Sequence, residues 1–446
     1  MNTKSLPTTD KPIEFFESEV RSYCRNFDNV FHKAKGSEIT DENGVKYLDF
    51  LMGAGSLNYG HNNPEIKQAV SNYIDEDGVI LSLDLYTKAK RSFVNTFDRR
   101  ILKPRNLDYK LQFTGPTGTS VIESALKLVR KYTGRKSVVA FTNSFHGMSA
   151  GSLSITASKN HRQNHTPSDG VIRMPFDDFL SNGGDSFSYL EEMLSQPGNG
   201  FELPAAIFLE TIQGEGGINV ASIEWLRKIR KLTKEMGILM VVDDIQMGCG
   251  RTGDFFSFDL SGIVPDIVCL SKSLSGYGFP MALMLLRPQL DVWSPGEDNG
   301  TFRGNNLAMV SATKTLDHYW ATNDFASDIA QKSRILSQKL TEMAARYCHI
   351  IESVRGRGLI QGLVFRSPAE AKLTMQNCFK SQLILETCGP RDEVVKLMPA
   401  LTIPEEKLLD GLNRLRESIA LVSQRGRITN YGISIPKRRI KEAELY

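Results

Sequence analysis

Short apolar runs alternate with amphipathic stretches through the middle of the chain. Five apolar residues at 238–242 lie between Gly237 and Asp243. Such a run is too short for most helices and is typical of a strand buried on both faces of a parallel sheet. The pattern returns at 267–270, and comparable runs occupy 111–113, 137–141, 205–210 and 282–287.

The stretches between these runs predict helices. Apolar residues recur at helical spacing in 64–75, 87–101, 120–131, 222–236, 326–347 and 404–423, and a short helix is expected over 12–24. Residues 36–50 predict a hairpin, residues 51–64 a loop, and 354–365 and 394–398 strands of a second sheet. The prediction is an α/β protein with a large domain over 48–320, built on a mostly parallel central sheet. A smaller α+β domain is expected from 1–47 and 321–446.

The bulk properties narrow the class of protein. The length of 446 residues fits one large and one small domain, and a formal charge of +3 gives no electrostatic case for a nucleic-acid partner. No apolar run approaches a membrane span, and no secretory signal is visible at the amino terminus. The six scattered cysteines form no C-x-x-C pair, which favours reduced thiols in the cytoplasm without a metal. The basic tail at 425–446 is expected to be a solvated end.

Two of the predicted strands carry chemistry at their carboxyl ends, where ligands bind in open α/β sheets. The first ends in Asp243 and the second is followed by Lys272. An acid can keep a pyridine nitrogen protonated, and a lysine can bind an aldehyde covalently. Together they are the minimal equipment of an enzyme that uses pyridoxal 5′-phosphate (PLP).

A literal G-x-G-x-x-G at 248–253 suggests a dinucleotide site instead. The glycines of such a site must open a helix that packs back on the preceding strand. Here the following residues are aromatic and are interrupted by Gly262 and Pro265, without helical spacing. We therefore expect these glycines to shape a loop.

Residues 115–119, Gly-Pro-Thr-Gly-Thr, precede the helix expected from Ser120. Glycine and hydroxyl residues at a helix amino terminus can bind an anion such as phosphate. Simple capping of the helix by Thr119 or Ser120 explains them equally well.

In this order, the segments GAGSLNYGHNNP, GPTGT, ETIQGEGGINVASIEWLR, VVDDIQMGCGRTG, SKSLSGYG and NGTFRGNNLA resemble the class III aminotransferases of PLP fold type I. The resemblance covers residues 15–423. It implies PLP as cofactor and a homodimer, or a higher homo-oligomer, with shared active sites. It also implies transfer of an amino group from L-glutamate to an amino aldehyde, L-aspartate 4-semialdehyde, which gives L-2,4-diaminobutyrate and 2-oxoglutarate, with a place in ectoine biosynthesis.

The resemblance also assigns roles to residues. Lys272 would bind the cofactor and move the proton, and Asp243 would pair with the ring nitrogen. The remaining cofactor contacts are Ile245 and Phe145 on the two ring faces, Gln246 near the phenolic oxygen, Gly118 and Thr119 at the phosphate, and Thr301 reaching the phosphate of the neighbouring subunit.

Glu215 and Lys396 are expected to bind substrate. In many relatives the matching glutamate pairs with an arginine that clamps a substrate carboxylate and is released when the substrates exchange. This chain has Lys396 at that position, so we expect a looser switch, against the alternative of a surface salt bridge. Met148 replaces an arginine that many relatives carry, and residues 77–90 and Asp298 also depart from the family pattern, so the resemblance supports the reaction class more firmly than the substrate.

Three alternatives stay open. The chain could be an aminotransferase for another short diamine or amino aldehyde, or it could be a PLP aminomutase, which needs no glutamate. The third alternative is a homologue without catalytic activity. The presence of Lys272, Asp243, Gln246 and Thr301 argues against it, because drift would erode several of them.

Overall fold

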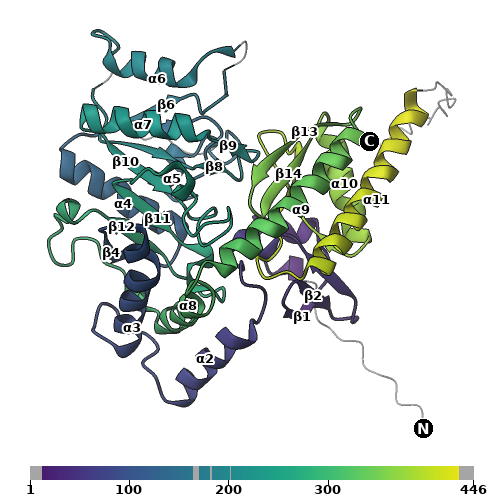
Figure 1. The fold of residues 1–446 in the computed structure, drawn as a ribbon, viewed down its shortest axis with the longest axis horizontal. Helices are drawn as coiled ribbons and strands as arrows, with labels where there is room; N and C mark the ends of the chain where they lie inside the picture. Colours follow the sequence, from purple (N-terminus) through teal and green to yellow (C-terminus); the bar gives the residue numbers. More distant parts are fainter. Residues whose placement is uncertain (1–12, 164–169, 181–182, 201, 431–446) are drawn as a thin grey trace, which may run out of the picture.

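The computed structural model describes residues 13–163, 170–180, 183–200 and 202–430 (Figure 1). Its centre is a seven-stranded sheet in the order β4-β12-β11-β10-β7-β5-β6. Strand β12 (Leu283–Leu286) runs antiparallel to both neighbours, and the other neighbouring strands pair in parallel. The predicted α/β architecture with a mostly parallel sheet is confirmed.

Strand β10 (Leu239–Asp243) shows why the buried runs form this sheet. All five of its residues are buried, and successive side chains point to opposite faces. Met240 and Val242 join an apolar cluster with helix α7 (Ile223–Met236), whereas Leu239 and Val241 join a second cluster with helix α4 (Gly118–Thr133). Helices therefore cover both faces, and the polar side chains of the strand are confined to its end.

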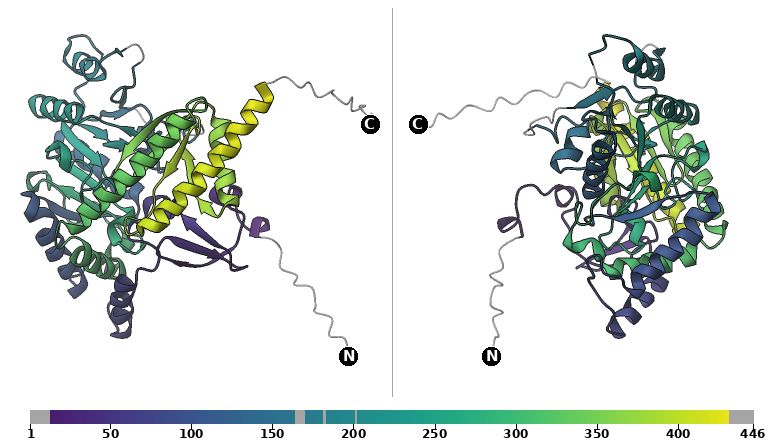
Figure 2. Two further views of the ribbon diagram at one scale, coloured as in Figure 1. Left: turned by 45° about the vertical axis from the view of Figure 1, so that its right-hand side comes forward. Right: turned by 90° about the vertical axis from the view of Figure 1, so that its left-hand side faces the viewer.

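A smaller lobe, residues 27–50 and 324–424, lies beside this sheet (Figures 1 and 2). Both chain ends contribute to it, because β3 (Lys46–Asp49) pairs in parallel with β15 (Leu383–Ile384). A second, antiparallel sheet has the order β13-β14-β17-β16. The predicted domain boundaries near residues 48 and 320 stay a prediction. The lobe contains β1 (Phe31–Lys35), β2 (Glu38–Asp41), β13 (Ile351–Arg357), β14 (Ile360–Phe365), β16 (Glu386–Cys388), β17 (Val394–Leu397), α9 (Asp324–Arg346), α10 (Pro368–Lys380) and α11 (Glu405–Asn430).

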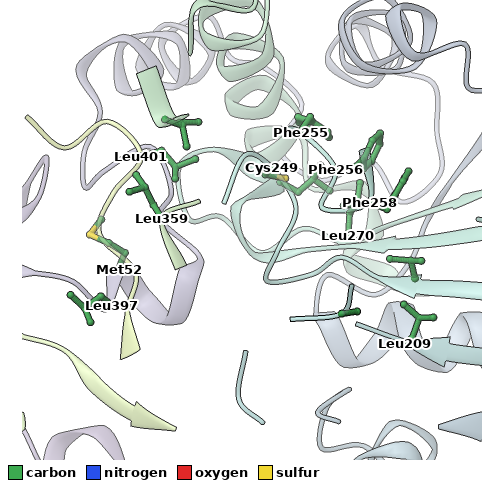
Figure 3. Close-up of a cluster of buried hydrophobic side chains, with 14 of the residues drawn as sticks. Met52, Leu209, Cys249, Phe255, Phe256, Phe258, Leu270, Leu359, Leu397 and Leu401 are labelled. Atoms are coloured by element: carbon green, nitrogen blue, oxygen red, sulfur yellow. The ribbon is translucent and has the colours of Figure 1, made fainter. Parts of the chain in front are cut away.

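A buried apolar cluster joins the small lobe to the central sheet (Figure 3). Leu209 and Leu270 come from the ends of central strands, and Leu359, Leu397 and Leu401 come from the small lobe. Aromatic residues of the loop after β10 fill the space between them. The strand ends that carry the proposed chemistry are thus packed against the second lobe.

Three expected elements differ in the structure. The helix expected over 12–24 is wrong: the described part, from residue 13, forms only the 3-10 turns Ile13–Phe15 and Tyr23–Arg25, whose large apolar and aromatic side chains are exposed. The loop expected at 51–64 contains the short helix α1 (Met52–Gly55). Helix α4 begins at Gly118, not Ser120, because Thr117 caps it by accepting a hydrogen bond from the Ser120 amide.

The remaining strands and helices predicted from the apolar pattern lie close to their expected positions: α2 (Pro64–Asp75), α3 (Lys88–Phe97), β4 (Lys110–Phe113), β5 (Val138–Phe141), β7 (Ala206–Leu209) and β11 (Ile267–Leu270). The structure also contains a π turn (Asp98–Leu102), α5 (Ala150–Ile155), β6 (Val171–Met174), α6 (Ser186–Ser195), β8 (Ile212–Gln213), β9 (Asn219–Val220), α8 (Asn306–Tyr319) and the 3-10 turns Lys103–Arg105, Asp259–Ser261, Lys272–Ser275, Pro288–Leu290 and Thr301–Gly304.

Within the described ranges, no helix combines the length and apolarity that a membrane crossing requires. The first residues, where we expect no secretory signal, and the end of the basic tail at 431–446 lie outside those ranges.

Candidate active site

Asp243 and Lys272 lie at the carboxyl ends of two neighbouring parallel strands. Asp243 is the last residue of β10, where it pairs in register with Cys269 of β11. Lys272 follows β11 and opens a 3-10 turn. The structure thus delivers the acid and the amine to one sheet edge, as the sequence predicts.

The Asp243 carboxylate is fixed on both oxygens. Its Oδ1 accepts a hydrogen bond from the Ile245 amide at 3.1 Å, and its Oδ2 lies 2.7 Å from Nδ1 of His146. Only 5% of Asp243 is exposed. Among the described residues, Nε2 of the buried His146 has no hydrogen-bond partner. Sequence reasoning missed His146; a histidine shortly after the end of β5 was the one available signal.

The amine of Lys272 is prepared for nucleophilic attack. Burial lowers its pKa below the ordinary value, although the carboxylates of Glu215 and Asp243 oppose the shift. A lysine with a lowered pKa is uncharged more of the time, and the uncharged amine is the nucleophile. Lys272 also has a φ of +47°, a left-handed conformation that costs free energy in a residue other than glycine and recurs at functional sites.

Phe145 lies just beyond β5 and is held by its backbone. Its amide donates a hydrogen bond to Glu210 Oε1 at 3.0 Å. Burial, followed by repulsion from Asp243, raises the pKa of Glu210 well above its usual range. Glu210 therefore supports the Phe145 backbone from the end of β7.

The amino terminus of α4 meets the residue after Asp243. Gly118 packs so closely on Ile245 that an added Cβ would lie 3.2 Å from Ile245 Cγ2. The Thr119 hydroxyl lies 2.5 Å from the hydroxyls of both Ser149 and Ser152. Free amides and hydroxyl groups gather here at the start of a sixteen-residue helix, which is the chemistry that binds a phosphate.

Glu215 and Lys396 form the expected ion pair, but not at the surface. Lys396 Nζ donates to Glu215 Oε1 at 2.8 Å, and Gln246 Nε2 donates to the same oxygen at 3.0 Å. The Lys396 side chain is fully buried, so the alternative of a surface salt bridge is wrong. A second carboxylate, Glu386, lies 2.9 Å from the same ammonium, and sequence reasoning missed it. The electrostatic effect of Lys396 and Lys272 outweighs burial and lowers the pKa of Glu215 to about 2.

Two further sequence features lie outside this group. Within one chain, Thr301 does not contact the other site residues. Thr301 is exposed and begins a 3-10 turn, next to the exposed Phe302. The glycines at 248–253 lie in turns with no helix directly after them, which agrees with the rejection of a dinucleotide site.

The described side chains fit a PLP cofactor. A buried carboxylate is available for the ring nitrogen, and the lowered pKa of Lys272 suits covalent binding of an aldehyde. Gly118 leaves room where a side chain would press on Ile245, an aliphatic residue suited to a ring face. The helix amino terminus beside it suits the phosphate.

Comparisons with known proteins agree with this geometry. The family model for aminotransferase class III matches residues 22–419. Diaminobutyrate–2-oxoglutarate transaminases of Halalkalibacterium halodurans and Bordetella parapertussis are 51% and 49% identical to the chain. They cover 93% and 92% of it, and the matches span 97% and 95% of their own lengths.

Solved structures show the same fold. Ornithine aminotransferase from Toxoplasma gondii has a TM-score of 0.78 at 27% identity and covers 90% of this chain and 92% of its own. An S-selective transaminase from Bacillus megaterium has a TM-score of 0.81 at 20% identity, with 95% and 96% coverage. These likenesses confirm PLP fold type I. The chain belongs to the class III aminotransferases.

Proposed function

We propose that this aminotransferase moves the amino group of L-glutamate to the terminal carbon of L-aspartate 4-semialdehyde, giving L-2,4-diaminobutyrate and 2-oxoglutarate. The observation that carries the proposal is the identity of about half of all positions, over nearly the full length, to proteins named diaminobutyrate–2-oxoglutarate transaminase. The reaction proceeds in two half-reactions, with one substrate leaving before the other binds.

The cofactor is pyridoxal 5′-phosphate, which when bound supplies a cationic ring that withdraws electrons from the bond being broken. Asp243 would hold the ring nitrogen, and Ile245 and Phe145 would lie against the two ring faces. Gln246 would approach the phenolic oxygen. Gly118 and Thr119 would bind the phosphate through the amino terminus of α4.

Lys272 would hold the cofactor aldehyde through its amine and would also act as general base and acid. When free, this amine would accept the proton from the substrate carbon that carries the amino group and would donate it again in the same half-reaction. The lowered pKa supports this role, because an amine that is too basic would stay protonated. Lys396 would bind the substrate carboxylate after Glu215 releases it, so that one pocket accepts both an ω-amine and glutamate.

Two copies of the chain would share their sites. Thr301 is exposed, and the next residue, Phe302, exposes 64% of its surface. Tyr86, in the segment that Asp84 joins to Arg303 by an ion pair, is 100% exposed. A second copy would cover this apolar surface and receive Thr301 at its cofactor phosphate. Sedimentation should therefore give a dimer or a larger homo-oligomer, whereas a monomer that is active with glutamate would contradict shared sites.

The deciding experiment is an acceptor panel with glutamate as the donor. We expect 2-oxoglutarate to form with L-aspartate 4-semialdehyde faster than with other short amino aldehydes. An aminomutase would turn over without glutamate, and a silent homologue would show no change in cofactor absorbance when glutamate is added. Lys272→Ala should lower the rate by about 10³-fold or more. Lys314→Ala, which removes a half-buried lysine paired with Glu65, should keep the rate.

Two predictions extend beyond the reaction itself. A place in ectoine biosynthesis would be supported by neighbouring genes for an acetyltransferase and an ectoine synthase. The expected cytoplasmic location would be checked by fractionation of cells that express the tagged chain.

A further inference from the structure

Lys396 lies between two carboxylates, although one is enough to neutralise it. Its ammonium is 2.8 Å from Glu215 Oε1 and 2.9 Å from Glu386 Oε1, and its side chain is fully buried. Burial alone would lower the pKa of Lys396, but the two carboxylates raise it well above the ordinary value. The ammonium is therefore charged and depends on its partners.

The two carboxylates are held differently. Glu386 lies on β16, directly opposite Lys396 of β17 in the antiparallel register, and 11% of its side chain is exposed. Glu215 lies between β8 and β9, and 31% of its side chain is exposed. Cross-strand partners keep their spacing because the sheet fixes both backbones. Glu386 is thus the fixed partner, and Glu215 is the one that a substrate can reach.

The backbone around Glu215 is nevertheless anchored. Its carbonyl accepts a hydrogen bond from the Gly389 amide at 3.0 Å, and Arg355 donates to the Gly217 carbonyl at 3.1 Å. Release of Lys396 therefore needs only a rotation of the Glu215 side chain.

We propose that Glu386 is a positioning residue that keeps Lys396 paired during the exchange of Glu215 for the substrate carboxylate. This inference rests on the proposed function. The exchange passes through a state in which neither Glu215 nor the substrate touches the ammonium. Without Glu386 the buried ammonium would be unpaired in that state, which is strongly unfavourable, and Glu386 keeps it paired. Glu386 thereby compensates for a lysine that lacks the bidentate fork of arginine.

The test separates the two half-reactions in single-turnover experiments with the holoenzyme. Glutamate needs the exchange because its α-carboxylate must reach Lys396, whereas the ω-amine of diaminobutyrate reacts while Glu215 still covers Lys396. We expect Glu386→Gln to slow the glutamate half-reaction about tenfold or more, and to change the diaminobutyrate half-reaction less than about twofold. The association rate of glutarate, an unreactive dicarboxylate, should fall in parallel.

Glu393→Gln is the matched control, because Glu393 is a buried carboxylate of the same sheet region that accepts a hydrogen bond from the Arg391 amide instead of pairing with Lys396. It should leave both half-reactions unchanged. Glu386→Asp, which keeps the charge, should restore part of the glutamate rate. In a Lys396→Met background, Glu386→Gln should have no further effect.

Equal slowing of both half-reactions by Glu386→Gln, or slowing of neither, would overturn the inference. Failure of the wild-type enzyme to convert glutamate would instead overturn the proposed function, so the two failures are distinguishable.

Discussion

Nδ1 of His146 lies 2.7 Å from Oδ2 of Asp243, and both side chains are buried. The contact joins the residue that follows Phe145 to the acid at the end of β10. A carboxylate with a single free rotation can turn away from a ring nitrogen. The histidine removes that freedom, much as outer partners orient metal ligands.

We therefore expect His146→Leu to lower kcat/KM with glutamate by about 10- to 100-fold. The variant should keep the cofactor, because Lys272 and the amino terminus of α4 are untouched. Steady-state kinetics and cofactor absorbance measure the two effects separately.

His61→Gln is the matched control for this prediction. His61 Nε2 lies 2.8 Å from Asp49 Oδ2 in a similarly enclosed pair, outside the central sheet. The His61→Gln variant should retain a near-normal kcat/KM with glutamate. Equal losses in both variants would show that the histidine–carboxylate contact matters only for folding.

The buried carboxyl of Asp244 should make the free energy of unfolding depend on pH. Burial raises its pKa to about 7 from an ordinary value of 3.8, so the folded protein binds a proton there that the unfolded chain releases. The stabilisation is complete below the ordinary pKa and is lost as the pH rises through 7. Asp244→Asn cannot ionise and can still accept the hydrogen bond from the Ser257 amide.

The Asn variant should therefore match the wild type near pH 4 and exceed its unfolding free energy by about 4 kcal/mol above pH 7. Thermal unfolding across this range checks the prediction. A constant difference between the two proteins at all pH values would contradict it.

Substitution of Asp266 should lower the free energy of unfolding without removing a group that takes part in the reaction. Its carboxylate accepts hydrogen bonds from Arg230 at 2.6 and 3.0 Å, from Arg287 at 3.1 Å and from the Met240 amide at 2.8 Å. Asp266→Asn leaves the buried Arg230 without its counter-ion, which should cost about 3–5 kcal/mol of unfolding free energy. Glu224→Gln, which breaks an exposed pair with Lys228, should cost less than about 1 kcal/mol.

Substitution of Gly118 should change the affinity for the cofactor. A methyl group there would lie 3.2 Å from Ile245 Cγ2, so Ile245, which is expected against one ring face, would have to shift. Gly118→Ala should raise the dissociation constant for PLP about tenfold, as measured by titration of the apoenzyme. Thr117→Ala, which removes the cap of α4, should instead cost about 1 kcal/mol of stability with little change in affinity.

The strand ends were predictable from sequence because burial on both faces leaves a distinctive apolar run. That run places Asp243 and Lys272 without further information, since parallel strands end at one edge. The cap of α4 was expected at Thr119 or Ser120, two or three residues after its actual position at Thr117. Glycine, threonine and serine all occur there, and composition does not say which of them adopts the extended backbone of a cap.

His146 and Glu386 were missed for a different reason. Each is a single polar residue whose role depends on a neighbour far along the chain, Asp243 in one case and Lys396 in the other. Neither lies in a periodic pattern, so only the register of β16 on β17 and the path of the chain after β5 bring these contacts together.

The parallel pairing of β3 with β15 also constrains biosynthesis. The ribosome releases the first three strands early, but their partner emerges only after the whole central sheet and α10. Until then the apolar face of this nascent sheet lacks its cover, a state that favours aggregation and recruits chaperones. Translation that stops before residue 383 would leave the amino-terminal hairpin without its last strand.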